Sequence, residues 1–202
     1  MKKLESTFMN MFLALLGVTL VSSTALAFIY KMTKDPIDKA MEDAKKRAIE
    51  KVVPAFDNNP LADSYKIPSD LDSLMVYPAM KGDSAIGYAI ETYTKKAFNG
   101  KFKIMVGFLP DGTIKDISVL EASETPGLGD KIKKEKSFDK KTGKSWSSQF
   151  MDKNPATFKL IVKKDGGDVD AITAATISSR AFCDAVSRGY NALIQANKIK
   201  TE

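Results

Sequence analysis

The longest apolar stretch of the chain lies near its N-terminus, where residues 8–30 include no charged residue. Lysines flank this stretch on both sides, at Lys2, Lys3, Lys31 and Lys34. As a helix it would be roughly 35 Å long at about 1.5 Å per residue, enough to cross a hydrocarbon core ~30 Å thick. The pattern predicts one membrane-spanning helix over residues 8–30.

A cleaved signal peptide is the alternative for this segment, because Ala25-Leu26-Ala27 forms an A-x-A cleavage site. Apolar character continues beyond that site to Tyr30, a residue type that favours membrane interfaces, which favours an uncleaved anchor. We expect residues 1–7 to be a short cytoplasmic N-terminus and residues 31–202 to form an extracytoplasmic domain. The protein would then be a single-pass protein of the inner (cytoplasmic) membrane with its C-terminal domain on the periplasmic side.

After this stretch the apolar positions follow first a helical and then a strand-like pattern. Helical spacing extends over residues 36–53, with Asp35 as a candidate N-cap and Pro36 as the first helical residue. A connection rich in proline and asparagine follows, and a final amphipathic helix is predicted over residues 177–197. Segments rich in β-branched and aromatic residues predict strands at 74–80, 85–94, 102–109, 113–121 and 158–163.

These elements predict an α+β fold, with a single N-terminal transmembrane helix followed by one domain. Short turn sequences containing glycine separate the first four strands, at Gly82, Gly100 and Gly112. Strands joined by such short turns pair in antiparallel fashion. We therefore expect an antiparallel sheet with flanking helices.

Composition narrows the chemistry that this domain can perform. The chain contains no histidine and a single cysteine, Cys183. Histidine-dependent triads, the usual zinc sites, disulfides within the chain and iron–sulfur clusters are therefore excluded, and we expect no metal site. Any redox chemistry must come from an organic cofactor. The net charge of +6 arises from 31 basic residues spread among 25 acidic ones, a pattern that does not favour nucleic-acid binding.

Residues 124–129, Glu-Thr-Pro-Gly-Leu-Gly, are the first candidate binding segment. Glycines at positions 127 and 129 would let backbone amides approach a ligand closely. A tight loop in which Pro126 fixes one torsion angle explains the same residues without any ligand.

Residues 170–180, at the start of the last predicted helix, are the second candidate segment, because small and hydroxyl side chains are concentrated there. The free amides and positive dipole of a helix N-terminus suit a phosphate group. Ordinary helix capping by Thr173, Thr176 or Ser178 is the alternative.

Together these segments resemble the FMN-binding G subunits of Rnf ion-translocating electron transport complexes, which are related to the C subunits of sodium-translocating NADH:quinone reductases. The attachment motif of that family, Asp-x-x-Ser/Thr-Gly-Ala-Thr, is matched by Asp170, Thr173, Ala175 and Thr176. The chain also reproduces two other family elements, Glu-Thr-Pro-Gly-Leu-Gly at 124–129 and Trp-x-x-Gln-Phe as Trp146, Gln149 and Phe150. Ala174 stands where glycine is usual, and Ala122-Ser123 replaces a pair that contains histidine.

The resemblance covers essentially the whole chain and implies an electron-transfer flavoprotein subunit that is not an enzyme on its own. It implies FMN joined as a phosphoester to Thr176 by a flavin transferase, and other subunits of a membrane complex that couples ferredoxin and NAD to ion transport. Membrane lipid would surround the anchor, and Asp170 would order the motif loop. The residues expected around the cofactor are Thr173, Ala174, Ala175, Glu124, Thr125, Gly127, Leu128 and Gly129.

Two other functions are consistent with parts of this pattern. A stand-alone membrane-anchored flavoprotein could deliver electrons to another reductase. A non-enzymatic, pilin-like structural protein would share the layout of an apolar N-terminal helix followed by a β-rich domain. Pilin-like proteins resemble one another in a glutamate early in the apolar segment, and residues 8–30 contain none.

Overall fold

The computed structural model describes residues 7–70 and 72–199, which form two compact units divided after Ala44. From Phe8 onward the first unit is helical and belongs to α1, which spans Phe8–Val52. An apolar window within α1 is long enough to cross a membrane and is not buried by other residues, although a signal sequence would share both properties.

The helix start predicted at Asp35-Pro36 is wrong, because Pro36 lies inside the continuous helix α1. A proline within a helix removes one backbone hydrogen bond and usually bends or ends it. Here the residues that follow are mostly Ala, Met, Lys and Glu, which have high helix propensity, and the helix continues through the proline.

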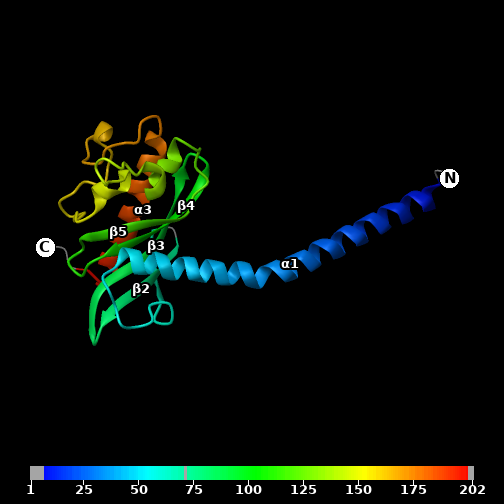
Figure 1. Cartoon of the computed structure of the whole chain (residues 1–202), viewed down its shortest axis with the longest axis horizontal. Helices are drawn as coiled ribbons and strands as arrows, with labels where there is room; N and C mark the ends of the chain where they lie inside the picture. The colour runs from blue at the N-terminus through cyan, green and yellow to red at the C-terminus, as the bar shows by residue number, and fades with distance from the viewer. Residues whose placement is uncertain (1–6, 71, 200–202) are drawn as a thin grey trace. The chain divides into compact units, whose positions relative to one another are not determined.

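The second unit is built on a five-stranded antiparallel sheet with the strand order β1-β2-β3-β4-β5 (Figure 1). Its strands are β1 (Tyr65–Pro68), β2 (Ser73–Lys81), β3 (Ser84–Ala97), β4 (Gly100–Phe108) and β5 (Ile114–Glu121). The predicted α+β class and the four strands of the meander are confirmed.

Two strand predictions differ from the structure. The short edge strand β1 lies in the segment expected to be an irregular connection, because proline and polar residues surround it. The strand predicted over 158–163 is wrong: this segment contributes one isolated bridge, between Val162 and Val169, and then the 3-10 helix η3 (Lys163–Asp165). The alternating apolar residues of this segment, Phe158, Leu160 and Val162, pack into the core from a loop and not from a strand.

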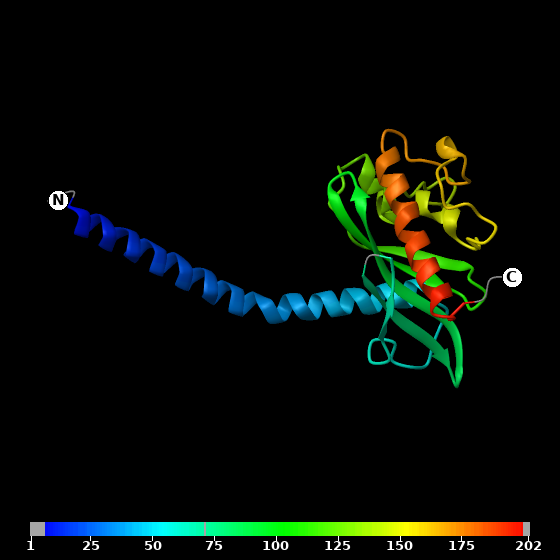
Figure 2. The same cartoon turned by 180° about the vertical axis from the view of Figure 1, so that it is seen from behind.

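Helices cover both faces of the sheet (Figures 1 and 2). The helix α3 (Thr176–Gln195) packs on one face, where Phe182, Val186 and Leu193 are fully enclosed in the larger core. Ala48, Ile49 and Val52, from the end of α1 that belongs to the second unit, pack on the other face.

The chain between β5 and α3 forms an irregular region at one end of the sheet, beside the start of α3 (Figure 1). It includes the short helices η1 (Gly129–Ile132), α2 (Lys134–Ser137) and η2 (Trp146–Phe150). Phe150 is fully buried, and its ring lies 5.1 Å from that of Phe182. This contact fixes η2 against α3. The Trp-x-x-Gln-Phe element and the segment at the start of α3 therefore lie at the same end of the domain.

Candidate functional site

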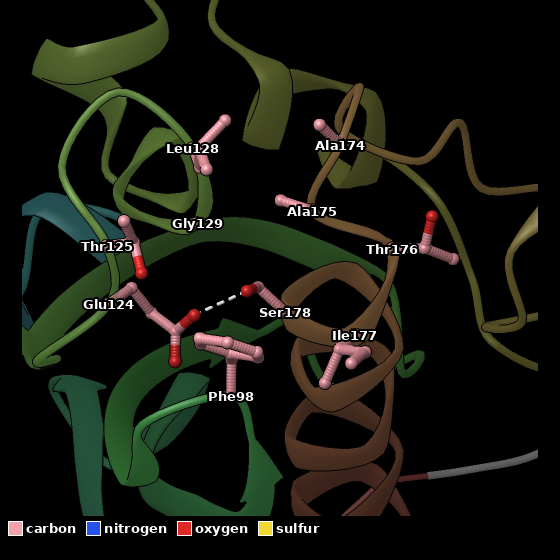
Figure 3. A pocket seen from close by; sticks show the side chains of 10 residues that line it. All are labelled: Phe98, Glu124, Thr125, Leu128, Gly129, Ala174, Ala175, Thr176, Ile177 and Ser178. Carbon is pink, nitrogen blue, oxygen red and sulfur yellow. Dashed lines mark hydrogen bonds between the residues drawn. The ribbon is translucent and has the colours of Figure 1, made fainter.

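A cavity of about 330 Å³ lies at the start of α3, where the two candidate segments meet (Figure 3). All predicted cofactor residues except Gly127 and Thr173 line this cavity. The lining residues are Phe98, Glu124, Thr125, Leu128, Gly129, Ala174, Ala175, Thr176, Ile177 and Ser178.

The first segment forms a tight turn in which Gly127 shapes the backbone. The amide of Leu128 donates a hydrogen bond to the carbonyl oxygen of Thr125 over 3.2 Å. Pro126 occupies the second position of this turn, and Gly127 occupies the third with a φ of 77°. A positive φ at the third position and proline at the second are typical of a type II turn. The turn directs Leu128 to the cavity.

A second turn, which also has a positive φ at its third position, lies between Ile172 and Ala175. The amide of Ala175 donates to the carbonyl oxygen of Ile172 over 3.0 Å, and Ala174 at the third position has a φ of 61°. This conformation costs an L-residue other than glycine roughly 1–2 kcal/mol. The geometry therefore agrees with the glycine that the resembling attachment motif has at the position of Ala174. Thr173 occupies the exposed second position.

The helix α3 begins at Thr176 without a side-chain cap, so the capping alternative for the hydroxyl groups does not apply. The first amides of a helix have no partner within it and form its positive dipole end. Within the described chain the Thr176 hydroxyl makes no hydrogen bond. Its half-buried side chain points away from Glu124 and Ser178, whereas the Ala175 side chain points across the cavity toward the loop that carries Leu128 and Gly129 (Figure 3).

A buried carboxylate joins the two segments below the cavity. Glu124 is 7% exposed and accepts a hydrogen bond from the hydroxyl of Ser178 in the first turn of α3. Gly129 packs directly on this pair, and a β-carbon at position 129 would overlap both Glu124 and Ser178. Any larger residue at position 129 would therefore displace the Glu124–Ser178 pair.

The Trp-x-x-Gln element holds the backbone that leads to the second turn. Trp146 Nε1 donates to the carbonyl oxygen of Asp170 over 2.6 Å, and the Asp170 amide donates to Gln149 Oε1 over 2.7 Å. The Asp170 side chain is 67% exposed and pairs with Lys163 over 2.8 Å. Asp170 thus orders the loop through its backbone, and its carboxylate lies outside the cavity.

Sequence reasoning missed four residues of this site. Phe98 and Ile177 are 63% and 48% exposed at the cavity, and an aromatic residue beside the Asn99-Gly100 turn is the available signal for Phe98. Ser178 was expected only as a cap. Ser179 accepts a hydrogen bond from the amide of Ile172 over 2.9 Å and donates to the Ala175 carbonyl over 3.0 Å, which closes the turn onto the helix.

The site offers no set of metal ligands. Over residues 7–70 and 72–199, no group of three or more His, Cys, Asp or Glu residues could hold a metal ion. Cys183 is buried, and burial raises the pKa of its thiol to about 12, so it remains protonated at neutral pH.

Comparison with known proteins agrees with this description. A model of the FMN-binding domain matches residues 97–191. The chain is similar to the G subunit of the ion-translocating oxidoreductase complex of Shewanella amazonensis, with 34% identity over 87% of this chain and 83% of the relative. The proteins of the same name from Haemophilus influenzae (strain PittEE) and Pasteurella multocida are 35% and 33% identical, over 91% and 89% of this chain and 88% and 91% of the relatives.

Proposed function

The chain belongs to the family of G subunits of ion-translocating oxidoreductase complexes, and from this premise we propose that it carries FMN covalently on Thr176. We propose further that it is the electron-transfer subunit of an Rnf-type complex, which couples ferredoxin and NAD to ion transport. The observation that carries the attachment is the free Thr176 hydroxyl at the uncapped start of α3, beside the cavity.

The residues present fit FMN. The volume of about 330 Å³ lies within the range of about 300–1,000 Å³ that is usual for small-molecule sites. Leu128 and Ile177 offer apolar surface to an aromatic ring, while the start of α3 offers amides to a phosphate. When bound, FMN supplies reversible electron transfer at its isoalloxazine ring.

Thr176 would act as the nucleophile in the attachment by a flavin transferase. Its Oγ1 forms a bond to the phosphorus of the FMN half of FAD, the pyrophosphate P–O bond breaks, AMP leaves and the hydroxyl proton is released. The half-buried side chain points away from the Glu124–Ser178 pair (Figure 3), which favours access by a second protein. The amides of the first turn of α3 would then stabilise the phosphate charge.

The membrane arrangement follows from α1. We propose that residues 8–30 span the inner membrane among lipid and other subunits, that residues 1–7 are cytoplasmic, and that residues 31–202 form the periplasmic domain. A reporter enzyme fused after Glu202 tests this orientation. A fusion that is active only in the cytoplasm would contradict it.

The relatives are named as subunits of an oxidoreductase complex, which favours a subunit of a complex over a stand-alone flavoprotein carrier. The FMN-binding domain match disfavours the pilin-like alternative. Copurification of the full chain with other membrane proteins after mild detergent extraction tests the first preference. A chain that always purifies alone would favour the stand-alone carrier.

Denaturing electrophoresis under ultraviolet light tests the covalent link. We expect the full chain, produced together with a flavin transferase, to retain flavin fluorescence, and Thr176→Val to lose it. Thr176→Ser restores a hydroxyl and should recover part of the signal. Thr157→Val is the matched control and should stay fluorescent, because Thr157 is exposed and does not line the cavity. A dark wild-type band, with a transferase shown to act on another substrate, overturns the proposal.

A further inference from the structure

Phe98 is a large aromatic residue whose position the core does not explain. It lies in the two-residue turn between β3 and β4, next to the Ala97–Gly100 pair, and its side chain is 63% exposed. Nevertheless it lines the cavity, on the side opposite Leu128 (Figure 3). Leu128 and Ile177 are also exposed there, at 40% and 48%. Three elements far apart in the sequence thus place apolar side chains around the same space.

The turn that carries Phe98 is tied to the rest of the site. Asn99 Nδ2 donates to the carbonyl oxygen of Ser123 over 2.8 Å, and the Asn99 amide donates to Glu124 Oε1 over 3.5 Å. The other oxygen of the same carboxylate accepts the hydrogen bond from Ser178. Glu124 therefore fixes the Phe98 turn relative to the first turn of α3.

The stem of this hairpin is tied to α3 as well. Thr94 Oγ1 donates to Asp184 Oδ2 over 2.8 Å, and Thr94 is fully buried. Lys96 Nζ pairs with the other oxygen of Asp184 over 2.5 Å. These contacts hold the backbone of the turn from both sides, so the turn that carries Phe98 is preorganised to meet a ligand and needs little further ordering on binding.

We infer that Phe98 is a cofactor-contacting residue that forms one wall for the isoalloxazine ring, and that Glu124 is the positioning residue that holds this wall. The inference rests on the proposed function. A flat aromatic side chain packs well against a flat heteroaromatic ring, and phenylalanine has no polar group that would need a partner once it is covered. The ligand would bury the apolar surface that Phe98 exposes in its absence.

Flavin fluorescence of the native, full-length protein in detergent tests the inference. An indole in contact with an excited flavin quenches its fluorescence by passing an electron to the ring and taking it back. We expect Phe98→Trp to lose most of the fluorescence that the loaded wild type shows. We also expect Phe98→Ala to increase quenching by iodide, since removal of the wall exposes the ring to solvent.

The matched controls are Phe138→Trp and Phe138→Ala. Phe138 is a similarly exposed phenylalanine, at 54%, and does not line the cavity. Both control variants should behave as the wild type. Flavin bound per protein is first measured on denatured samples. Equal quenching in the Phe98 and Phe138 variants, with flavin attached, overturns the inference and leaves the proposed function intact. Absence of covalent flavin in the wild type overturns both.

The positioning role of Glu124 has its own readout. Glu124→Ala keeps Phe98 and the Thr94–Asp184 contact of its hairpin stem, but it removes the tie between the Phe98 turn and the first turn of α3. Iodide quenching should therefore rise toward the level of Phe98→Ala. Glu124→Gln keeps one oxygen that can accept the Ser178 hydrogen bond and should restore part of the protection. If Glu124→Ala does not fold, Ser178→Ala removes the hydrogen bond that joins Glu124 to the first turn of α3 and should show the same rise. Unchanged iodide quenching in the folded variant overturns this role.

Discussion

The indole nitrogen of Trp146 donates a hydrogen bond to the main-chain carbonyl oxygen of Asp170 over 2.6 Å. This contact joins η2 to the loop that leads into α3, and Gln149 closes it by contacting the amide and the carbonyl of Asp170. Trp146 and Gln149 therefore hold the backbone at Asp170, the first residue of the segment that leads to Thr176.

Trp146→Phe should destabilise the domain by about 1 kcal/mol, the usual net value of one such hydrogen bond. The substitution keeps an aromatic ring against Phe150 and Phe182, whose ring centres lie 5.5 and 5.1 Å from that of Trp146. Urea unfolding measures the loss. We also expect less flavin per protein, because the loop before Thr176 is less ordered. An unchanged unfolding midpoint together with full flavin loading would contradict this account.

Ala174→Gly should stabilise the protein. Relief of the positive φ of 61° gains roughly 1–2 kcal/mol, while the greater freedom of glycine in the unfolded chain costs about 0.4–1 kcal/mol. The net gain of about 0.5–1 kcal/mol corresponds to a rise in Tm of a few °C, measurable by thermal unfolding. The control is Ala175→Gly, where φ is −137° and the side chain is buried, and it should lower Tm. Equal shifts in both variants would show that the turn is not strained.

Gly107→Ala should be strongly destabilising. A β-carbon at position 107 would overlap the main-chain carbonyl of Val52, where the end of α1 packs on β4. Backbone cannot move aside as a side chain can, so the loss should reach the upper part of the ~1–3 kcal/mol range for overpacking. In the control, Gly189→Ala, the added methyl meets the Cγ2 methyl of Ile90 at 3.1 Å and no backbone atom, and the gain in helix propensity offsets that contact. A small effect of both substitutions on urea unfolding would show that α1 does not dock closely at Gly107.

The Asp70–Arg188 pair predicts a dependence of stability on acid. The hydrogen bond from the Arg188 guanidinium, 2.8 Å away, is the main cause that lowers the pKa of Asp70 in the folded protein. A carboxyl group whose pKa is lowered by folding stabilises the protein above its unfolded pKa of about 4. That contribution disappears as the pH falls through the lower folded value.

Asp70→Asn removes this contribution at neutral pH. The difference in unfolding free energy between wild type and variant should be constant near pH 7 and shrink below pH ~4. It should be modest, because the Asp70 side chain is 63% exposed and solvent screens the pair. Urea unfolding at a series of pH values measures it. Curves that stay parallel through the acid range would show that Asp70 gains nothing from Arg188.

The sequence predicts a helix or strand correctly where the spacing of its apolar residues matches the face that the element buries. The strands β2 to β5 are long enough for turn residues and β-branched side chains to mark them, and α3 carries a clear apolar stripe. The strand expected over 158–163 is absent because the same apolar residues can pack against a core from a loop. The helix start expected at Pro36 is wrong for the opposite reason: a helix-breaking residue does not end a helix when the residues around it favour one.

Residue types and their spacing were enough to predict the α+β class, the exclusion of chemistry that depends on histidine or on paired cysteines, and two short segments suited to hold a cofactor. Only the tertiary structure decided that Phe98, Glu124 and Ser178 meet around one cavity, since they come from a hairpin, a loop and a helix. It also decided that Ala174 sits in a left-handed turn and that Asp170 acts through its backbone. Such relationships follow from packing between distant segments, which no local pattern records.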